Sequence, residues 1–132
     1  MKLRPMLTLE DCKKISTAAE AEAKKNSWNV CIAILDDGGH LLHLARMDGS
    51  TPANARIAVE KGRTAAETRR STANWQERVG KRLELLRMPG VTPVQGGVPI
   101  VVDGTCVGAV GVSGVQSHED EQIAAAGIKA LG

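Results

Sequence analysis

Two turn sequences constrain the fold of this chain more than any other feature. Residues 36–39 read Asp-Asp-Gly-Gly and residues 103–104 read Asp-Gly, and each turn stands between apolar runs of strand length. Asp-Gly and Gly-Gly supply the positive φ angles that tight hairpin turns require. The sequence therefore predicts two β-hairpins, the first from strands 30–35 and 40–47 and the second from strands 98–102 and 105–113.

The segments around the hairpins predict helices. Residues 9–25 follow Thr8, a good N-cap, and carry acidic residues in the first turn, where the helix dipole favours negative charge. A second helix is expected after Thr51, because Pro52 suits a first helical position. Two more helices are expected, a polar and basic one over residues 74–88 with an interruption near Gly80, and a final one over residues 118–131.

The shortage of aromatic residues indicates how these elements pack. The chain has two Trp and no Phe or Tyr, so its core must be built from small and aliphatic residues. Strand 30–35 is apolar on both faces, which is typical of an interior strand. Both this strand and a stripe of small residues on the second helix also fit self-assembly. The stripe predicts very close packing against the sheet or a partner helix, and its members are Ala55, Ala58, Gly62, Ala65 and Ala66.

The order of elements indicates the fold class. A helix, a hairpin, one or two helices, a second hairpin and a last helix describe an antiparallel sheet of four or five strands covered by helices. The chain contains no repeat and no linker, and its 132 residues suit one core. We therefore predict a single α+β domain over residues 1–132.

The charge and the cysteines exclude several classes of protein. The formal net charge of +2 is too small to indicate a nucleic-acid partner, and the basic stretch 56–87 contains one aromatic residue, Trp75, for stacking on bases. Cys12, Cys31 and Cys106 are far apart and lack zinc-ligand spacing, so we expect reduced thiols. No signal-peptide pattern and no apolar run of membrane-spanning length are present, so we expect a cytoplasmic protein without a membrane partner.

Three blocks of sequence resemble those of the GlcG/HbpS-like heme-binding family. They are the hairpin at 34–42 with Arg-Met-Asp-Gly at 46–49, then Lys61 with Thr-Ala-Ala at 64–66, then Gly-Gly-Val-Pro-Ile at 96–100 with Val-Gly-Ala-Val-Gly-Val-Ser-Gly at 107–114. Asp120 and the alanine-rich final helix complete a match that spans nearly the whole chain in the correct order. The chain is therefore identified as a member of this family.

The resemblance implies a profilin-like fold, assembly into dimers or octamers, and binding of heme or a related tetrapyrrole. A heme site needs an iron ligand such as His, Cys, Met or Tyr, and an apolar slot for the macrocycle. Two histidines are candidate metal ligands: His40, expected at the surface after the first turn, and His43, expected in mid-strand as a partly buried, hydrogen-bonded side chain. His118 is expected at a helix N-terminus, as a neutral imidazole or a cap.

A second candidate site combines Lys61, Thr64, Gly96 and Gly97. In this family the Gly-Gly-Val-Pro loop should lie near the helix that bears Lys61 and Thr64. Unhindered glycine amides can cradle an anion, and an ammonium group with a hydroxyl group would complete a site for a small anionic ligand or for the propionates of a tetrapyrrole. The alternative is structural, with a turn at the glycines, a solvated Lys61 and a packed Thr64.

No catalytic machinery is recognisable in the sequence. The chain has no Gly-X-Ser-X-Gly, no His-Glu-X-X-His and no phosphate loop. We therefore expect an oligomeric ligand-binding protein with an accessory or sensing role. Two alternatives stay open: a small catabolic enzyme that acts on an organic acid or aromatic compound through the Lys61, Thr64 and Gly96-Gly97 pocket, and a structural subunit that supports assembly.

Overall fold

The two predicted hairpins join into one antiparallel sheet. The computed structural model describes residues 1–132 and places four strands in the order β2-β1-β4-β3. Strands β1 (Cys31–Asp36) and β2 (Leu41–Arg46) form the first hairpin, and β3 (Gly97–Val102) and β4 (Thr105–Ser113) form the second. Strands β1 and β4 pair in the middle of the sheet, so β2 and β3 are its edges. The α+β architecture is confirmed, with four strands.

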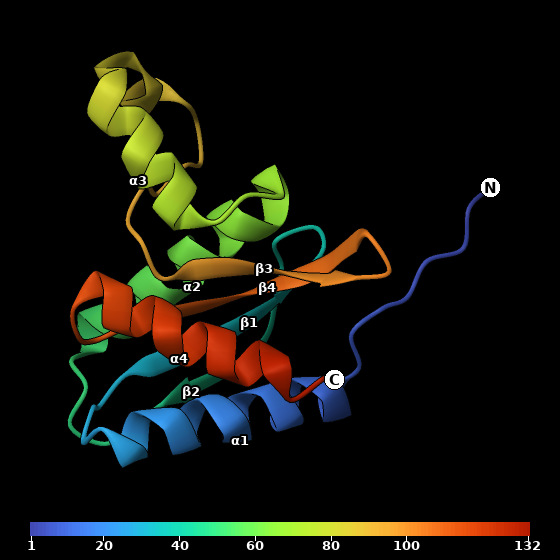
Figure 1. Ribbon diagram of the computed structural model, residues 1–132, viewed down its shortest axis with the longest axis vertical. Coiled ribbons are helices and arrows are strands. Elements are labelled where there is room, and N and C mark those ends of the chain that lie inside the picture. Colours follow the sequence, from blue (N-terminus) through green and yellow to red (C-terminus); the bar gives the residue numbers. More distant parts are fainter.

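Helices cover both faces of this sheet. Helices α1 (Leu9–Lys25) and α4 (Ser117–Lys129) lie side by side on one face, and α2 (Pro52–Thr68) covers the other (Figure 1). Thr8 caps α1 as predicted, because its hydroxyl oxygen accepts a hydrogen bond from the Asp11 amide at 3.1 Å. Helix α1 therefore begins where its capping residue places it, whereas Thr51, at the N-cap of α2, makes no side-chain cap hydrogen bond.

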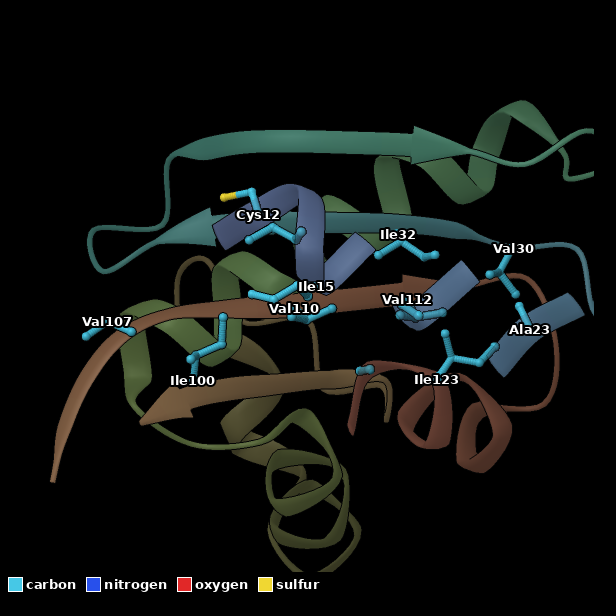
Figure 2. Close-up of a cluster of buried hydrophobic side chains, with 13 residues drawn as sticks. Cys12, Ile15, Ala23, Val30, Ile32, Ile100, Val107, Val110, Val112 and Ile123 are labelled. Carbon is cyan, nitrogen blue, oxygen red and sulfur yellow. The ribbon is translucent and has the colours of Figure 1, made fainter. Parts of the chain in front are cut away.

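The main core fills the space between the sheet and the pair α1 and α4. It consists of 13 buried residues without an aromatic ring, as the composition predicts. Figure 2 shows Ile15 of α1 beside Val110 and Ile123 of α4 beside Val112, both valines being on β4. Burial of this aliphatic surface stabilises the fold by roughly 25 cal/mol for each Å² removed from water.

Helix α2 approaches the opposite face of the sheet at very short range. Gly62 of α2 lies against Gly111 of β4, and a Cβ atom on Gly111 would clash with the Ala58 carbonyl oxygen. Ala58 also packs on buried side chains of β1. Close packing of the small-residue stripe against the sheet is confirmed. Because both faces of β1 are covered within one chain, neither the apolar strand nor the small-residue stripe of α2 requires a partner chain.

The segment between α2 and β3 differs from the prediction. Helix α3 (Thr72–Lys81) begins two residues earlier than expected and runs through Gly80, and a 3-10 turn, η1 (Leu83–Arg87), follows it. The interruption lies at Arg82, whose φ of −140° and ψ of 88° leave the helical region, and not at Gly80. Figure 1 shows that α3 and the turn after it project away from the sheet.

Candidate functional site

Lys61, Gly96 and Gly97 of the predicted anion site lie against one another, whereas the Thr64 hydroxyl group bonds to Glu60 and Thr92. Lys61 and Thr64 are on α2, and Gly96 and Gly97 lie at the start of β3. An ideal Cβ on Gly96 would stand 2.8 Å from Lys61 Nζ, and one on Gly97 would clash with the Lys61 carbonyl group. Glycine is therefore required at both positions by the close approach of α2, and Gly96 also has a φ of +135°.

Lys61 is buried and not solvated. Its side chain is 2% exposed, and Nζ donates hydrogen bonds to Asp120 Oδ2 at 2.9 Å and to the Val112 carbonyl oxygen at 3.0 Å. Asp120, in the first turn of α4, is equally buried, and its Oδ1 accepts a hydrogen bond from the Val115 amide at 3.1 Å. The ion pair therefore connects α2, β4 and α4.

Asp120 is the residue of this cluster that sequence reasoning did not assign a role. Burial raises the pKa of its carboxyl group, and the nearby Lys61 ammonium group opposes that shift. The two partners are 59 residues apart in the chain, so no local pattern pairs them. The available signal was an acidic residue at a helix N-terminus inside the block that resembles the family.

The remaining polar groups of the cluster are also bonded within the chain. The Thr64 hydroxyl group donates to the Glu60 carbonyl oxygen at 2.9 Å and accepts from the Thr92 amide at 2.9 Å. The Gly97 amide donates to the Thr72 hydroxyl oxygen at 2.8 Å. None of the four cavities on the molecule is lined by Lys61, Thr64, Gly96 or Gly97. A ligand site at these residues stays a prediction.

His40 lies at the surface, as expected for a residue that follows the first turn. Its side chain is 83% exposed, and Nδ1 lies 3.3 Å from Asp36 Oδ1. The same carboxylate oxygen accepts hydrogen bonds from the amides of Gly38 and His40, each at 2.9 Å. These hydrogen bonds outweigh the opposing effect of desolvation and lower the pKa of Asp36. His40 Nε2 has no hydrogen-bond partner within the chain.

The other two histidines differ from each other in environment. His43 is partly buried opposite Ile34 of β1, as predicted, but its buried Nδ1 atom has no hydrogen-bond partner. His118 is exposed in the first turn of α4, where Gln116 and not His118 is the N-cap. The predicted hydrogen bond at His43 is therefore absent at Nδ1, and the predicted cap at His118 is wrong.

The cavities of the single chain contain no histidine. The largest, of about 470 Å³, follows the outer side of α1, and its lining includes Lys13, Lys14, Ala18 and Ala130. No group of three or more His, Cys, Asp or Glu side chains is arranged to hold a metal ion. No helix has the length and apolar character needed to cross a membrane. Each histidine could thus provide one ligand to a metal ion, and no set of three or more side chains surrounds a metal position.

Comparisons with known proteins identify the relatives of this chain. The family described as haem degrading protein HbpS-like matches residues 7–129. Protein GlcG of Escherichia coli is 48% identical over 114 residues, which cover 86% of this chain and 85% of GlcG. A double-mutant crystal structure of Streptomyces reticuli HbpS superposes with a TM-score of 0.92 at 32% identity, over 100% of this chain and 91% of that chain.

A further solved structure is that of PduOC in complex with heme. It superposes with a TM-score of 0.87 at 25% identity and covers 96% of this chain and 95% of that chain. These matches extend over nearly the whole sequence, as do the motifs at the two hairpins and the central helix. The family model and the GlcG identity together establish the family. The chain belongs to the HbpS-like family.

Proposed function

We propose that this protein binds heme or a related tetrapyrrole in the cytoplasm, as a homo-oligomer with an accessory or sensing role. The observation that carries the proposal is the likeness to PduOC, a domain solved as a heme complex, over 96% of this chain. The match of residues 7–129 to the family described as haem degrading protein HbpS-like agrees with it. Bound heme would supply a redox-active iron centre.

His40 fits the role of iron ligand on the geometry of its own side chain. Asp36 holds Nδ1, which fixes the orientation of the ring and leaves Nε2 without a partner in the chain. A carboxylate behind a metal-binding histidine orients it in this way and raises the basicity of its other nitrogen. Leu41, the next residue, is 48% exposed and adds apolar surface beside the ring.

His43 is the second candidate ligand. Its unpartnered, buried Nδ1 atom is unusual, because buried polar atoms generally have hydrogen-bond partners. The ring is only partly exposed on β2, so iron would have less direct access to it than to His40. We therefore assign the main contact to His40 and expect a smaller contribution from His43.

A titration with hemin followed by Soret absorbance tests the proposal. Wild-type protein is expected to give a saturable shift. His40→Ala is expected to weaken binding by at least about tenfold, because even loss of a group that hydrogen-bonds to a metal-binding histidine weakens a metal site that much. His118→Ala is the matched control, because His118 is an exposed histidine distant in sequence from the first hairpin. A shift that grows without saturation, or equal spectra for all variants, would contradict the assignment.

A second candidate function uses the cluster around Lys61. We propose it, for Lys61, Thr64, Gly96 and Gly97, because the Lys61 ammonium group lies close to the Gly96 backbone. An organic acid would have to take the place of the Asp120 carboxylate beside Lys61 Nζ. Saturable hemin binding that is lost in His40→Ala would favour the first function, and absence of hemin binding would favour this second one.

A further inference from the structure

A small hollow opens at the end of the sheet where β2 stops. It has a volume of about 340 Å³ and lies between the second half of α1 and the turn that follows β2. Figure 1 shows that the chain leaves α1 and β2 at this same end of the molecule. The hollow is separate from His40, which precedes the other end of β2. Its lining consists of six residues: Glu20, Lys24, Asn29, Arg46, Met47 and Asp48.

The charges of this lining are balanced but are not paired with one another. Four of the six residues are charged, two positively and two negatively, so the hollow has no net charge. None of the four belongs to an ion pair within the chain. Even Glu20 and Lys24, which have the i, i+4 spacing on α1 at which such residues commonly pair, form no ion pair. Charges of both signs therefore gather around one hollow without neutralising each other by direct contact.

Each side of the hollow carries one cation and one anion. Glu20 and Lys24 belong to α1, whereas Arg46 and Asp48 stand on either side of Met47 at the end of β2. A molecule with one ammonium group and one carboxylate would therefore find an oppositely charged group on each side for both of its own charges. A molecule with a single charge would be attracted by two of these groups and repelled by the other two. Lys24, Arg46 and Asp48 are exposed, so a dissolved molecule can reach them.

The side of the hollow that follows β2 is fixed by hydrogen bonds beneath it. Ser50 is buried, and its hydroxyl group and its amide both donate to the Met47 carbonyl oxygen, at 2.6 Å and 3.2 Å. Asn29 packs against the same turn, because a Cβ atom on Gly49 would stand 2.9 Å from Asn29 Nδ2. The Asn29 amide carries a donor and an acceptor and therefore suits either charged end of a ligand. This side of the hollow is thus formed before any ligand binds.

We propose that this hollow binds a small zwitterion of the amino-acid type, with one ammonium group, one carboxylate and a short aliphatic chain. Its ammonium group lies between Glu20 and Asp48. Its carboxylate lies between Lys24 and Arg46, and its aliphatic chain contacts Met47, the apolar residue of the lining. A volume of about 340 Å³ corresponds to roughly ten water molecules, which is enough for the carbon chain and both charged groups. The inference does not depend on heme.

An NMR titration of the backbone amides of isotope-labelled protein tests the class of ligand. The probes share the length of their carbon chain: δ-aminovalerate and norvaline carry both charges, whereas valerate and pentylamine carry one each. At least one zwitterion is expected to give saturable shifts at Asn29, Met47 and Gly49. It is also expected to bind at least about threefold more tightly than either singly charged probe, the effect of one additional exposed charge pair.

Variants test whether both sides of the hollow contribute. Lys24→Met and Asp48→Asn are each expected to weaken zwitterion binding by about two- to fivefold, as loss of an exposed charge pair does. Lys24→Met should also strengthen the binding of pentylamine, because the lining becomes negative. Lys25→Met is the matched control, since Lys25 is 72% exposed on the same helix, pairs with Glu22 and does not line the hollow.

Three results would overturn the proposal. They are the absence of saturable shifts with both zwitterions, equally tight binding of a singly charged probe, and an equal loss of affinity in Lys25→Met. The amide spectra also show directly whether each variant is folded. Soret titration reads heme binding separately, at the other end of β2, so the heme proposal and this one fail independently.

Discussion

The ammonium group of Lys61 and the carboxylate of Asp120 face each other at 2.9 Å with almost no water around them. Such a pair is costly to bury, but loss of one partner costs more, because the other charge is left in the interior. Here the pair joins α2 to the first turn of α4 across the Val112 carbonyl group. At the scale of single residues, it is the polar contact on which the relative placement of these helices most depends.

Removal of one partner should therefore destabilise the protein strongly. Asp120→Asn is expected to lower the free energy of unfolding by about 3 to 5 kcal/mol. The double variant Lys61→Met with Asp120→Leu is expected to lose less than the sum of the two single losses, because no uncompensated charge stays buried. Urea unfolding of the wild type, Lys61→Met, Asp120→Leu and the double variant measures this coupling, and strictly additive losses would contradict it.

Asp36 predicts a pH dependence of stability at the first hairpin. Desolvation, the largest single effect, raises its pKa, but hydrogen bonds from two amides and the neighbouring His40 ring together outweigh it and lower the pKa in the folded state. The contribution of Asp36 to stability is therefore present above the unfolded-state pKa near 3.8 and is lost as pH falls through the lower folded-state value. The stability advantage of the wild type over Asp36→Asn should thus be constant from neutral pH down to about pH 5 and shrink as pH falls below about 4. Urea unfolding at several pH values checks this, and a constant difference would show that Asp36 is not responsible.

At the scale of elements, the helices and strands that could be predicted from the sequence are those whose ends are set by neighbouring residues. The turns at 36–39 and 103–104 and the cap at Thr8 depend on neighbouring residues, so strands and helices were predicted to within a few residues. The break at Arg82 was missed because Gly80, the residue with the weaker helical preference, is held in α3. The ion pair of the candidate site was missed because its partners meet only through tertiary packing.

The two glycines Gly111 and Gly80 give a contrast that tests the packing of α2. A side chain at Gly111 would clash with the Ala58 carbonyl oxygen, whereas Gly80 has no atom within 4 Å of a built Cβ. Gly111→Ala is expected to cost about 3 kcal/mol by overpacking, and Gly80→Ala to gain about 0.5 to 1 kcal/mol from a better helix former. Thermal unfolding of both variants compares them, and a tolerated Gly111→Ala would mean that α2 can move away from the sheet.

At the scale of the whole molecule, one end of the first hairpin combines the features that the heme proposal uses. His40 and Asp36 lie at its turn, and the exposed leucines Leu41, Leu42 and Leu44 follow along β2. The interior, in contrast, is complete within one chain, with helices on both faces of the sheet. We therefore expect heme binding to involve the surface of this hairpin and not the core.

The most direct test of the heme proposal is a Soret titration of wild-type protein and His40→Ala at equal concentration. The account predicts saturable binding by the wild type and a loss of at least about tenfold in affinity for His40→Ala, because removal of a ligand weakens a metal site to that extent. Absorbance that rises in proportion to added hemin, without saturation for the wild type, would contradict it.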